Sequence, residues 1–416
     1  MKKFLLIISS SFILIFQAQT FPVGHMSINF KDATRSGGYS ISGGIAMTGT
    51  GRTIGTEVYY PATIAGNNTS VAAGQFPVVV FGHGFAMTYD NYDNIYNGLA
   101  ASGYIVLLPR TEGSIFPNPN HADFGADIKL LATQGLLLNS ISTPTALTTF
   151  NGKVIQKVAI GGHSMGGGCS FIAAQNNTSV TCLFNLAAAT SNTAGISSVA
   201  GASLVTIPTL VISGEKDNVA DSAVQNNHFN PTASLTKFHS IIKDVTHCDF
   251  GNGTSATCNF GQASCSTPSC NIVLFNRYMS YIEPFLANQL KSDCNAGNAF
   301  MTLIQNPSID RIGRKVIGTI ACISTALQTQ IPIQNFSIFP NPTQDKISIS
   351  YSTDNPNLVV FELFDIYGKL ILSRSENSST EKNIRQELNI AHLENGSYIL
   401  YIRQNNLKTA YKIMKQ

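Results

Sequence analysis

One stretch decides the fold of this chain: Val158-Ala159-Ile160-Gly161-Gly162-His163-Ser164-Met165-Gly166-Gly167-Gly168. Its apolar beginning predicts a buried strand, and the residues after it, Phe171-Ile172-Ala173-Ala174, predict a helix. Between strand and helix, Gly162 to Gly166 fit the pattern G-x-S-x-G, which holds a serine on a strained turn with its hydroxyl exposed. Glycine flanks the serine because a Cβ would clash in so tight a turn. We therefore predict that Ser164 is a nucleophile, the alternative being an ordinary glycine-rich turn.

Buried strands alternate with helices on both sides of this turn. Continuous apolar runs are typical of strands that are covered on both faces of a parallel sheet. The expected strands are Phe76–Phe81, Tyr104–Pro109, Thr181–Ala187, Pro208–Ser213 and Lys237–Val245, and the expected helices are Asn94–Ser102, Asp123–Leu138 and Ile272–Leu290. Arg52–Pro61 alternates instead, which predicts an antiparallel edge strand closed by proline. This order predicts the α/β class, with a mostly parallel twisted sheet flanked by helices.

A serine hydroxyl is a weak nucleophile at neutral pH, so it needs a general base that a carboxylate orients. Both partners should follow later strands, because functional groups gather at the carboxyl ends of parallel strands. Asp217 comes just after the strand ending at Ser213, and Glu215 and Asp221 are the alternatives in that segment. His247 ends the next strand and completes the order Ser-Asp-His, which none of the other histidines does. We expect Ser164, Asp217 and His247 to be the catalytic residues.

Acyl transfer also requires donors for the oxyanion of the tetrahedral intermediate. One donor is expected to be the backbone N–H of Met165, the residue after the nucleophile. The other should come from the loop after an earlier strand, where Gly82-His83-Gly84-Phe85 places the N–H of Phe85. The alternative for this second segment is a glycine turn that only ends a strand.

Residues 40–292 resemble the α/β-hydrolases, and within them the branch of bacterial cutinases, polyester hydrolases and dienelactone hydrolases. The elbow around Ser164 is very similar to that of bacterial cutinases, and Tyr59-Tyr60-Pro61-Ala62, Pro208-Thr209-Leu210 and Thr246-His247 also match. The resemblance implies that Phe85 and Met165 flank the acyl group of a bound ester. The chain contains no tryptophan, so the indole that polyester hydrolases place beside the site is missing.

These observations predict a secreted serine hydrolase that cleaves carboxylic esters through an acyl-enzyme on Ser164, with activity on polyesters such as PET. An esterase for small-molecule or phospholipid esters is the alternative, because His247-Cys248-Asp249-Phe250 is loosely similar to phospholipid-acetyl hydrolases. A surface binding module without activity is a third reading, which the presence of all three triad residues disfavours. We expect a monomer that uses no cofactor and no metal. A net charge of +3 and no basic block argue against a nucleic-acid partner.

The first residues predict export. Met1-Lys2-Lys3 and the apolar run Phe4 to Phe16 are typical of a signal peptide, assigned here to residues 1–18. All eight cysteines follow it, and an even number outside the cytosol favours disulfides. Zinc is the alternative for Cys265-x4-Cys270, which lacks a histidine at metal spacing. The pairing stays open, and a bridge between Cys294 and Cys322 is one possibility.

The end of the chain resembles another family. Asn335-Phe336-Ser337-Ile338-Phe339-Pro340-Asn341-Pro342, Leu363 to Lys369 and Leu393 to Tyr398 are similar to the C-terminal sorting domain of the type IX secretion system. The resemblance implies a contact with that secretion machinery and a location outside the cell or on its surface. Short alternating runs predict a small all-β sandwich here. The expected organisation is residues 19–294 as the α/β-hydrolase domain, residues 295–330 as an extension with two helical segments, and residues 331–416 as the sorting domain.

Overall fold

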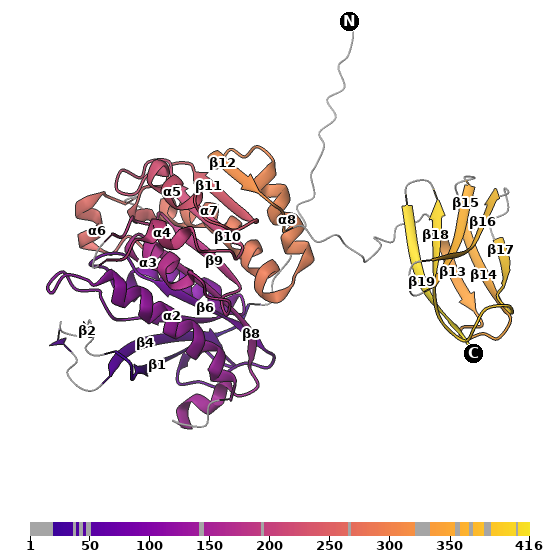
Figure 1. Ribbon diagram of the computed structural model, residues 1–416, viewed down its shortest axis with the longest axis horizontal. Coiled ribbons are helices and arrows are strands. Elements are labelled where there is room, and N and C mark those ends of the chain that lie inside the picture. Colours follow the sequence, from indigo (N-terminus) through magenta and orange to yellow (C-terminus); the bar gives the residue numbers. More distant parts are fainter. Residues whose placement is uncertain are drawn as a thin grey trace, which may run out of the picture. The chain divides into compact units, whose positions relative to one another are not determined.

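The computed structural model (Figure 1) describes residues 20–35, 39–40, 45–46, 51–140, 145–192, 195–264, 268–320, 333–353, 358–365, 369–377, 384–404 and 407–416. The chain forms two compact units, which divide between Cys322 and Ile323. The predicted signal peptide, residues 1–18, lies outside the described residues. No helix within the described ranges is long and apolar enough to cross a membrane.

A ten-stranded sheet in the order β12-β11-β10-β9-β8-β6-β7-β4-β1-β5 forms the centre of the first unit. Its strands are β1 (Val23–Asp32), β4 (Arg52–Pro61), β5 (Gly66–Asn67), β6 (Phe76–Gly82), β7 (Ile105–Pro109), β8 (Val154–His163), β9 (Cys182–Leu186), β10 (Thr209–Gly214), β11 (Lys237–Ile242) and β12 (Arg311–Ile317). The strands from β7 to β11 are parallel to their neighbours, whereas β4 and β12 pair antiparallel with them. The predicted fold class, a mostly parallel sheet flanked by helices, is confirmed.

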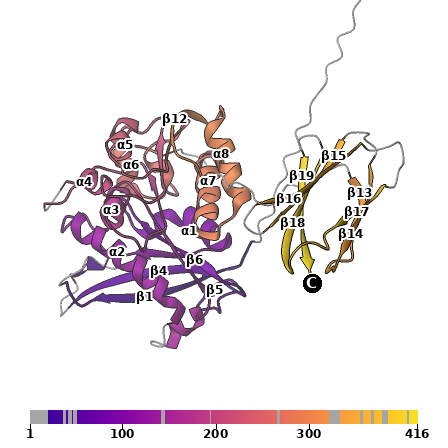
Figure 2. The same ribbon diagram turned by 45° about the vertical axis from the view of Figure 1, so that its right-hand side comes forward.

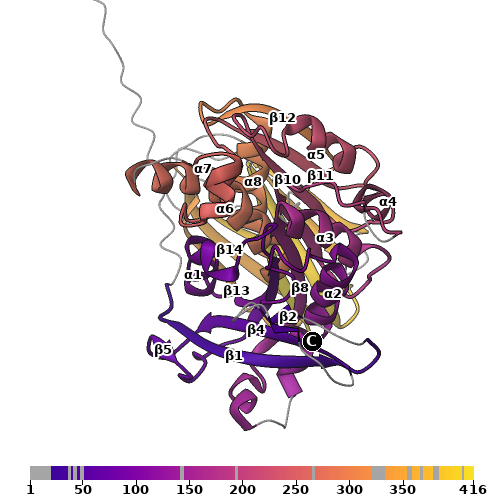
Figure 3. The same ribbon diagram turned by 90° about the vertical axis from the view of Figure 1, so that its left-hand side faces the viewer.

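Helices cover both faces of this sheet. They are α1 (Asp93–Ala101), α2 (His121–Leu137), α3 (Met165–Ala174), α4 (Ser198–Ala202), α5 (Ser222–Phe229), α6 (Ala256–Gly261), α7 (Pro268–Lys291) and α8 (Cys294–Gln305), with 3-10 turns η1 (Tyr89–Tyr92), η2 (Leu138–Ser140), η3 (Thr145–Phe150) and η4 (Cys248–Phe250). In Figure 3, α1 and α7 lie to the left, and α2, α3 and α4 lie to the right. Along β6, Val78 and Val80 pack in the core under α2 and α3, whereas Val79 and Phe81 pack in the core under α1 and α7. Burial on both faces explains why the strand is continuously apolar.

Two strand predictions need correction. β4 was expected at the edge, but β1 pairs with it from Val23 to Asp32 and lies outside it, together with β5 (Figure 2). The segment from Ile309 to Ile323 was expected to be helical, but β12 forms there and pairs antiparallel with β11. The open hydrogen-bonding edge of β11 decides the second case, since pairing along a strand outweighs a weak local preference for helix. The other part of the extension is helical, as α8.

The second unit is a β-sandwich of two antiparallel sheets. One sheet has the order β13-β14-β17 and the other the order β16-β15-β18-β19. The strands are β13 (Ile333–Phe339), β14 (Lys346–Thr353), β15 (Leu358–Asp365), β16 (Leu370–Asn377), β17 (Ile384–Asn389), β18 (Gly396–Gln404) and β19 (Leu407–Lys415). Ile349, Phe361 and Leu400 pack in its core. A small two-stranded sheet of β2 (Tyr39–Ser40) and β3 (Ile45–Ala46) belongs to the first unit.

Candidate active site

Ser164 lies between the end of β8 and the start of α3, with φ of 52° and ψ of −116°. A positive φ is strained for any residue other than glycine, so the fold holds this serine in an unusual conformation. The surrounding glycines make the turn possible. A Cβ on Gly162 would lie 2.5 Å from the backbone of Gly166, and one on Gly166 would lie 2.2 Å from the carbonyl oxygen of Gly82. The elbow expected from the sequence therefore forms against the loop that follows β6.

The structure brings Ser164, Asp217 and His247 together. His247 Nε2 lies 2.9 Å from Ser164 Oγ, and His247 Nδ1 lies 2.8 Å from Asp217 Oδ2. The three residues lie in the segments that follow β8, β10 and β11, and all three are buried. With the Nδ1 proton donated to Asp217, the other ring nitrogen can accept the proton of the serine hydroxyl.

The second carboxylate oxygen of Asp217 has its own partners. Oδ1 accepts the backbone N–H groups of Val219 and Ala220, each at 2.8 Å, which fixes the carboxylate plane. The two alternative acids have other contacts. Glu215 accepts the N–H of Asp244, and Asp221 accepts two N–H groups at the start of α5. The geometry therefore places only Asp217, of these three, beside the histidine.

The two expected oxyanion donors belong to the elbow and to the loop after β6. Met165 is the first residue of α3, so its N–H has no partner within the helix. No hydrogen bond between described residues engages the N–H of Met165 or of Phe85, whereas the neighbouring Gly84 and Gly166 both donate to protein oxygens. The ring of Phe85 is 43% exposed. The side chain of Met165 is buried in the core under α2 and α3, so it forms no exposed wall beside Ser164.

Tyr92 connects the loop that carries Phe85 to the elbow that carries Met165. The sequence analysis did not identify Tyr92 as part of the site. Its hydroxyl oxygen accepts the N–H of Gly84 at 2.9 Å and lies 2.8 Å from Nδ1 of His163. Burial raises the pKa of Tyr92, so the hydroxyl is neutral and can donate. Burial, and next the charge of His247, keep the pKa of His163 well below its usual range, so the ring is neutral and can accept. Tyr92 thus ties the residue before Phe85 to the residue before Ser164.

A buried ion cluster holds the next loop along the sheet edge. Arg52 pairs with Glu112 at 2.7 Å and with Asp127 at 2.6 Å, and Glu112 also accepts the N–H of Asn120 at the start of α2. Burial opposes the charge of Arg52, but hydrogen bonding and attraction from the two carboxylates outweigh it and raise its pKa. The cluster fixes both ends of residues 112–120, the loop whose tip carries Phe116.

Apolar side chains are exposed on loops that follow three of the parallel strands. Phe85 follows β6, Ile115 and Phe116 follow β7, and Val219 follows β10, with exposed fractions between 43% and 86%. Because the carboxyl ends of parallel strands share one edge of the sheet, these side chains belong to the same end of the molecule as Ser164. We call them the apolar rim.

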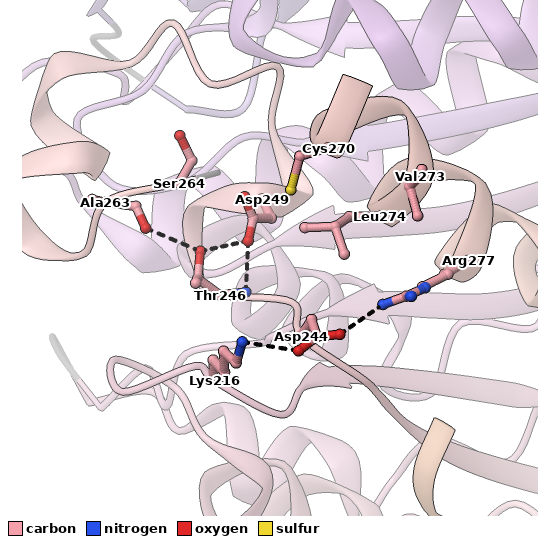
Figure 4. A pocket seen from close by; sticks show the side chains of 10 residues that line it. All are labelled: Lys216, Asp244, Thr246, Asp249, Ala263, Ser264, Cys270, Val273, Leu274 and Arg277. Atoms are coloured by element: carbon pink, nitrogen blue, oxygen red, sulfur yellow. Dashed lines mark hydrogen bonds and ion pairs between the residues drawn. The ribbon is translucent and has the colours of Figure 1, made fainter. Parts of the chain in front are cut away.

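A separate pocket of about 690 Å³ lies beside the loops that carry the acid and the histidine. Lys216 and Thr246, the residues before Asp217 and His247, belong to its lining, whereas Ser164 does not. Figure 4 shows Asp244 between Lys216 and Arg277, and the apolar residues Val273 and Leu274 also line the pocket. The distances from Asp244 are 2.8 Å to Lys216 and 3.1 Å to Arg277. These ion pairs join the loop that carries Asp217, the loop that carries His247 and helix α7.

Disulfides form in part as expected. Cys248, the residue after His247, is bonded to Cys258, and Cys270 and Cys294 are also disulfide-bonded. Cys169 and Cys182 are free and buried, so not all eight cysteines pair. The possible partner of Cys294, Cys322, lies outside the described residues. Among the side chains that the structure describes, no three of His, Cys, Asp or Glu form a group that could hold a metal ion.

Comparisons with known proteins match two parts of the chain. Residues 60–216 match the sequence model of the chlorophyllase family, and residues 337–416 match that of the secretion system C-terminal sorting domain. The chain is 27% identical to chlorophyllase-1, chloroplastic, of Citrus sinensis over 195 residues, which are 44% of this chain and 57% of the relative. It is 26% identical to chlorophyllase type 0 of Chenopodium album over 278 residues, 61% of this chain and 77% of the relative.

These matches favour the chlorophyllases over the other esterase families that the catalytic part of the chain resembles. The family match contains Ser164 and ends just before Asp217, and the chain spans little more than half of the Citrus relative. Membership of the cutinase branch stays a prediction, because the matching family is a different one. A domain of the sorting family indicates secretion to the cell surface or beyond it. Residues 60–216 are accordingly similar to the chlorophyllase family of α/β-hydrolase-like esterases, and residues 337–416 are similar to the secretion system C-terminal sorting domain.

Proposed function

We propose that this protein is a secreted serine hydrolase that cleaves carboxylic esters through an acyl-enzyme on Ser164. One observation carries the proposal: an unbroken line of hydrogen bonds runs from Ser164 through His247 to Asp217. It stands beside two backbone N–H groups that no described residue engages. A nucleophile, a base, an orienting carboxylate and oxyanion donors are the parts that acyl transfer needs.

In the first step, Ser164 Oγ attacks the ester carbonyl carbon while His247 Nε2 takes up the hydroxyl proton. Asp217 stabilises the resulting imidazolium without accepting its proton. The carbonyl oxygen becomes an oxyanion, and the N–H groups of Phe85 and Met165 donate to it. Preorganised donors of this kind supply a large part of the rate in acyl transfer, and removing one costs about 10²–10³ in kcat.

In the second step, the bond from the carbonyl carbon to the alcohol oxygen breaks, and His247 returns its proton to the leaving alkoxide. The acyl group is then bound to Ser164 Oγ. A water molecule gives a proton to His247 and attacks the same carbon, and collapse of the second tetrahedral intermediate releases the acid. The serine recovers its proton from His247, so the cycle consumes only ester and water.

Esters with a large apolar part are the substrates that the apolar rim favours. Such a part can be buried against the exposed side chains of Phe85, Ile115, Phe116 and Val219. Burial of apolar surface contributes roughly 25 cal/mol per Å² to the binding free energy. The relatives are chlorophyllases by name, which favours a bulky pigment-like ester. Polyester chains are the second candidate, favoured by the cutinase-like elbow. Without tryptophan, attack on aromatic polyesters should be slower than on aliphatic ones.

A substrate panel tests this assignment. The purified protein is incubated with p-nitrophenyl esters of graded acyl length, with chlorophyll, and with films of an aliphatic and an aromatic polyester. We expect turnover of the p-nitrophenyl esters and of at least one bulky substrate. Fast turnover of short soluble esters alone would favour the small-molecule reading. No hydrolysis of any ester would favour a binding module.

We also propose that residues 1–18 are removed on export, that residues 331–416 serve secretion only, and that the enzyme is a monomer. The two units have separate cores, which supports this division. Deleting residues 331–416 should leave ester turnover within about twofold of the full chain and stop export in the native host, because separate domains contribute little to each other's core. A folded but inactive truncated protein would contradict the division.

A further inference from the structure

We propose that Gln262 is a positioning residue, one that holds Asp217 and His247 in register. This inference rests on the proposed ester hydrolysis, since it concerns the same base and carboxylate. Gln262 is the residue that ends α6, and nothing in the sequence marks it as part of a site.

The side chain of Gln262 reaches both catalytic loops. Its carbonyl oxygen Oε1 accepts the backbone N–H of His247 and the backbone N–H of Asn218, each at 3.1 Å. Its amide Nε2 donates to the carbonyl oxygen of Lys216. An amide oxygen has two lone pairs, so both acceptor positions are used. One side chain thus binds the residues on both sides of Asp217 and the backbone of His247.

We call the three hydrogen bonds of the Gln262 side chain the clamp. It joins the two loops beyond the backbone hydrogen bonds that connect them near their strands. Further back, the N–H of Glu215 donates to Ile242 and the N–H of Lys216 donates to Val245, which joins the loops near their strands. Beyond those bonds, the backbones of Asp217 and His247 are linked through Gln262. The side-chain bond between the carboxylate and the ring depends on both backbones keeping their places.

The segment that carries Gln262 is itself fixed to the histidine loop. The disulfide between Cys248 and Cys258 ties α6 to the residue after His247. On the other side of Gln262, the carbonyl oxygen of Ala263 lies 3.3 Å from Thr246 Oγ1, which Figure 4 shows between Ala263 and Asp249. Gln262 therefore lies on a segment that a disulfide and a hydrogen bond fix to the histidine loop.

Loss of the clamp should reduce kcat and leave KM almost unchanged. The partners of Gln262 are backbone atoms of Lys216, Asn218 and His247, and none belongs to Ser164 or to an oxyanion donor. A misplacement of about 1 Å at a catalytic group can cost on the order of 10² in rate. We expect Gln262→Ala to lower kcat by about tenfold to a hundredfold, with KM within about twofold of wild type.

A second variant separates positioning from a merely structural role. Gln262→Glu keeps acceptor oxygens for the two N–H groups and loses the donor to Lys216. We expect a kcat between those of wild type and Gln262→Ala. We also expect the acidic limb of its pH profile to move to higher pH, because the added negative charge beside the histidine favours the protonated base. The matched control is Gln156→Ala, whose side-chain amide also donates to a carbonyl, that of Leu136, but in the first half of β8, away from Ser164.

The measurements are kcat, KM and pH profile on a p-nitrophenyl ester, with circular dichroism and thermal unfolding of each full-length variant. Unchanged kcat and pH profile in folded Gln262→Ala and Gln262→Glu would overturn the clamp. If Gln262→Ala fails to fold, Gln262→Glu carries the test through its pH profile.

If wild type itself shows no Ser164-dependent turnover, the proposed function fails, and a second readout still tests the clamp. The proton between His247 Nδ1 and Asp217 Oδ2 should give a low-field NMR signal. We expect this signal in wild type and Gln156→Ala, and its loss or broadening in Gln262→Ala. An unchanged signal in Gln262→Ala would overturn the clamp independently of activity.

Discussion

The two sides of the candidate site are held in different ways. Ser164 is fixed by its own backbone, in a turn between β8 and α3 that glycines make possible. His247 and Asp217 lie on two loops that side chains from elsewhere hold, among them Gln262 and the Cys248–Cys258 disulfide. The nucleophile side is thus encoded locally, within one stretch of chain. The base side is encoded by contacts that only the folded chain creates.

The largest expected effect comes from the nucleophile side. Ser164→Ala should lower ester turnover by several orders of magnitude, because a triad member acts as part of a unit. A serine-directed phosphonate should label Ser164 in wild type and no residue in the variant. Turnover and peptide mapping by mass spectrometry check both points. Labelling of another serine would place the nucleophile elsewhere.

Tyr92→Phe should weaken the connection between the oxyanion loop and the elbow. The change leaves the buried N–H of Gly84 and the ring of His163 without their shared partner, which costs about 1–3 kcal/mol of stability. We expect kcat to fall about tenfold, less than for a lost oxyanion donor. Tyr60→Phe is the control, because Tyr60 is equally buried and donates to the carbonyl of Thr69, outside the site. Equal activity losses in both variants would remove Tyr92 from the site.

Replacing the staple tests the base side. The double variant Cys248→Ser, Cys258→Ser opens a loop closed across a separation of 10 residues. A bridge of this kind contributes about 2–4 kcal/mol of stability. We expect a lower Tm and a severalfold lower kcat, because the segment with Gln262 is released. Cys182→Ala, at a free buried cysteine, serves as the control and should change Tm without a matching change in kcat.

The smallest expected effect is on the pH dependence of stability, through the imidazole ring of His163. The pKa of His163 is held well below 6.5 in the folded chain, mainly by burial. Below pH 6.5 the unfolded chain therefore binds a proton that the folded chain does not, so stability falls as the pH drops. His163→Gln should make the free energy of unfolding in urea less dependent on pH between 7.5 and 5. Gln156→Ala, which removes no titratable group, should leave that dependence unchanged.

Several parts of the fold were predictable because they follow local rules. Continuous apolar runs predicted the strands that are buried on both faces, and the glycines around Ser164 predicted the elbow. β12 was missed because Arg311–Ile317 forms a strand only against the open edge of β11. The position of β4 was also wrong, since the partner strand β1 had not been recognised as one.

The site shows the same limit. That Ser164, Asp217 and His247 lie together could be predicted from their order along the chain and their places after strands, and their catalytic roles remain a proposal. Tyr92 and Gln262 could not, because uncharged side chains that bind backbone atoms leave no pattern in a sequence. The burial of the Met165 side chain likewise depends on how α2 and α3 pack over the sheet.

The disulfide next to His247 has a consequence for when the protein matures. Disulfides are rarely kept in a reducing cytoplasm and form after a chain has left it. If the chain follows the proposed secretion route, the bond between Cys248 and Cys258 closes only after the chain has left the cytoplasm. On that route, the loop that carries His247 reaches its final rigidity outside the compartment where the chain is made.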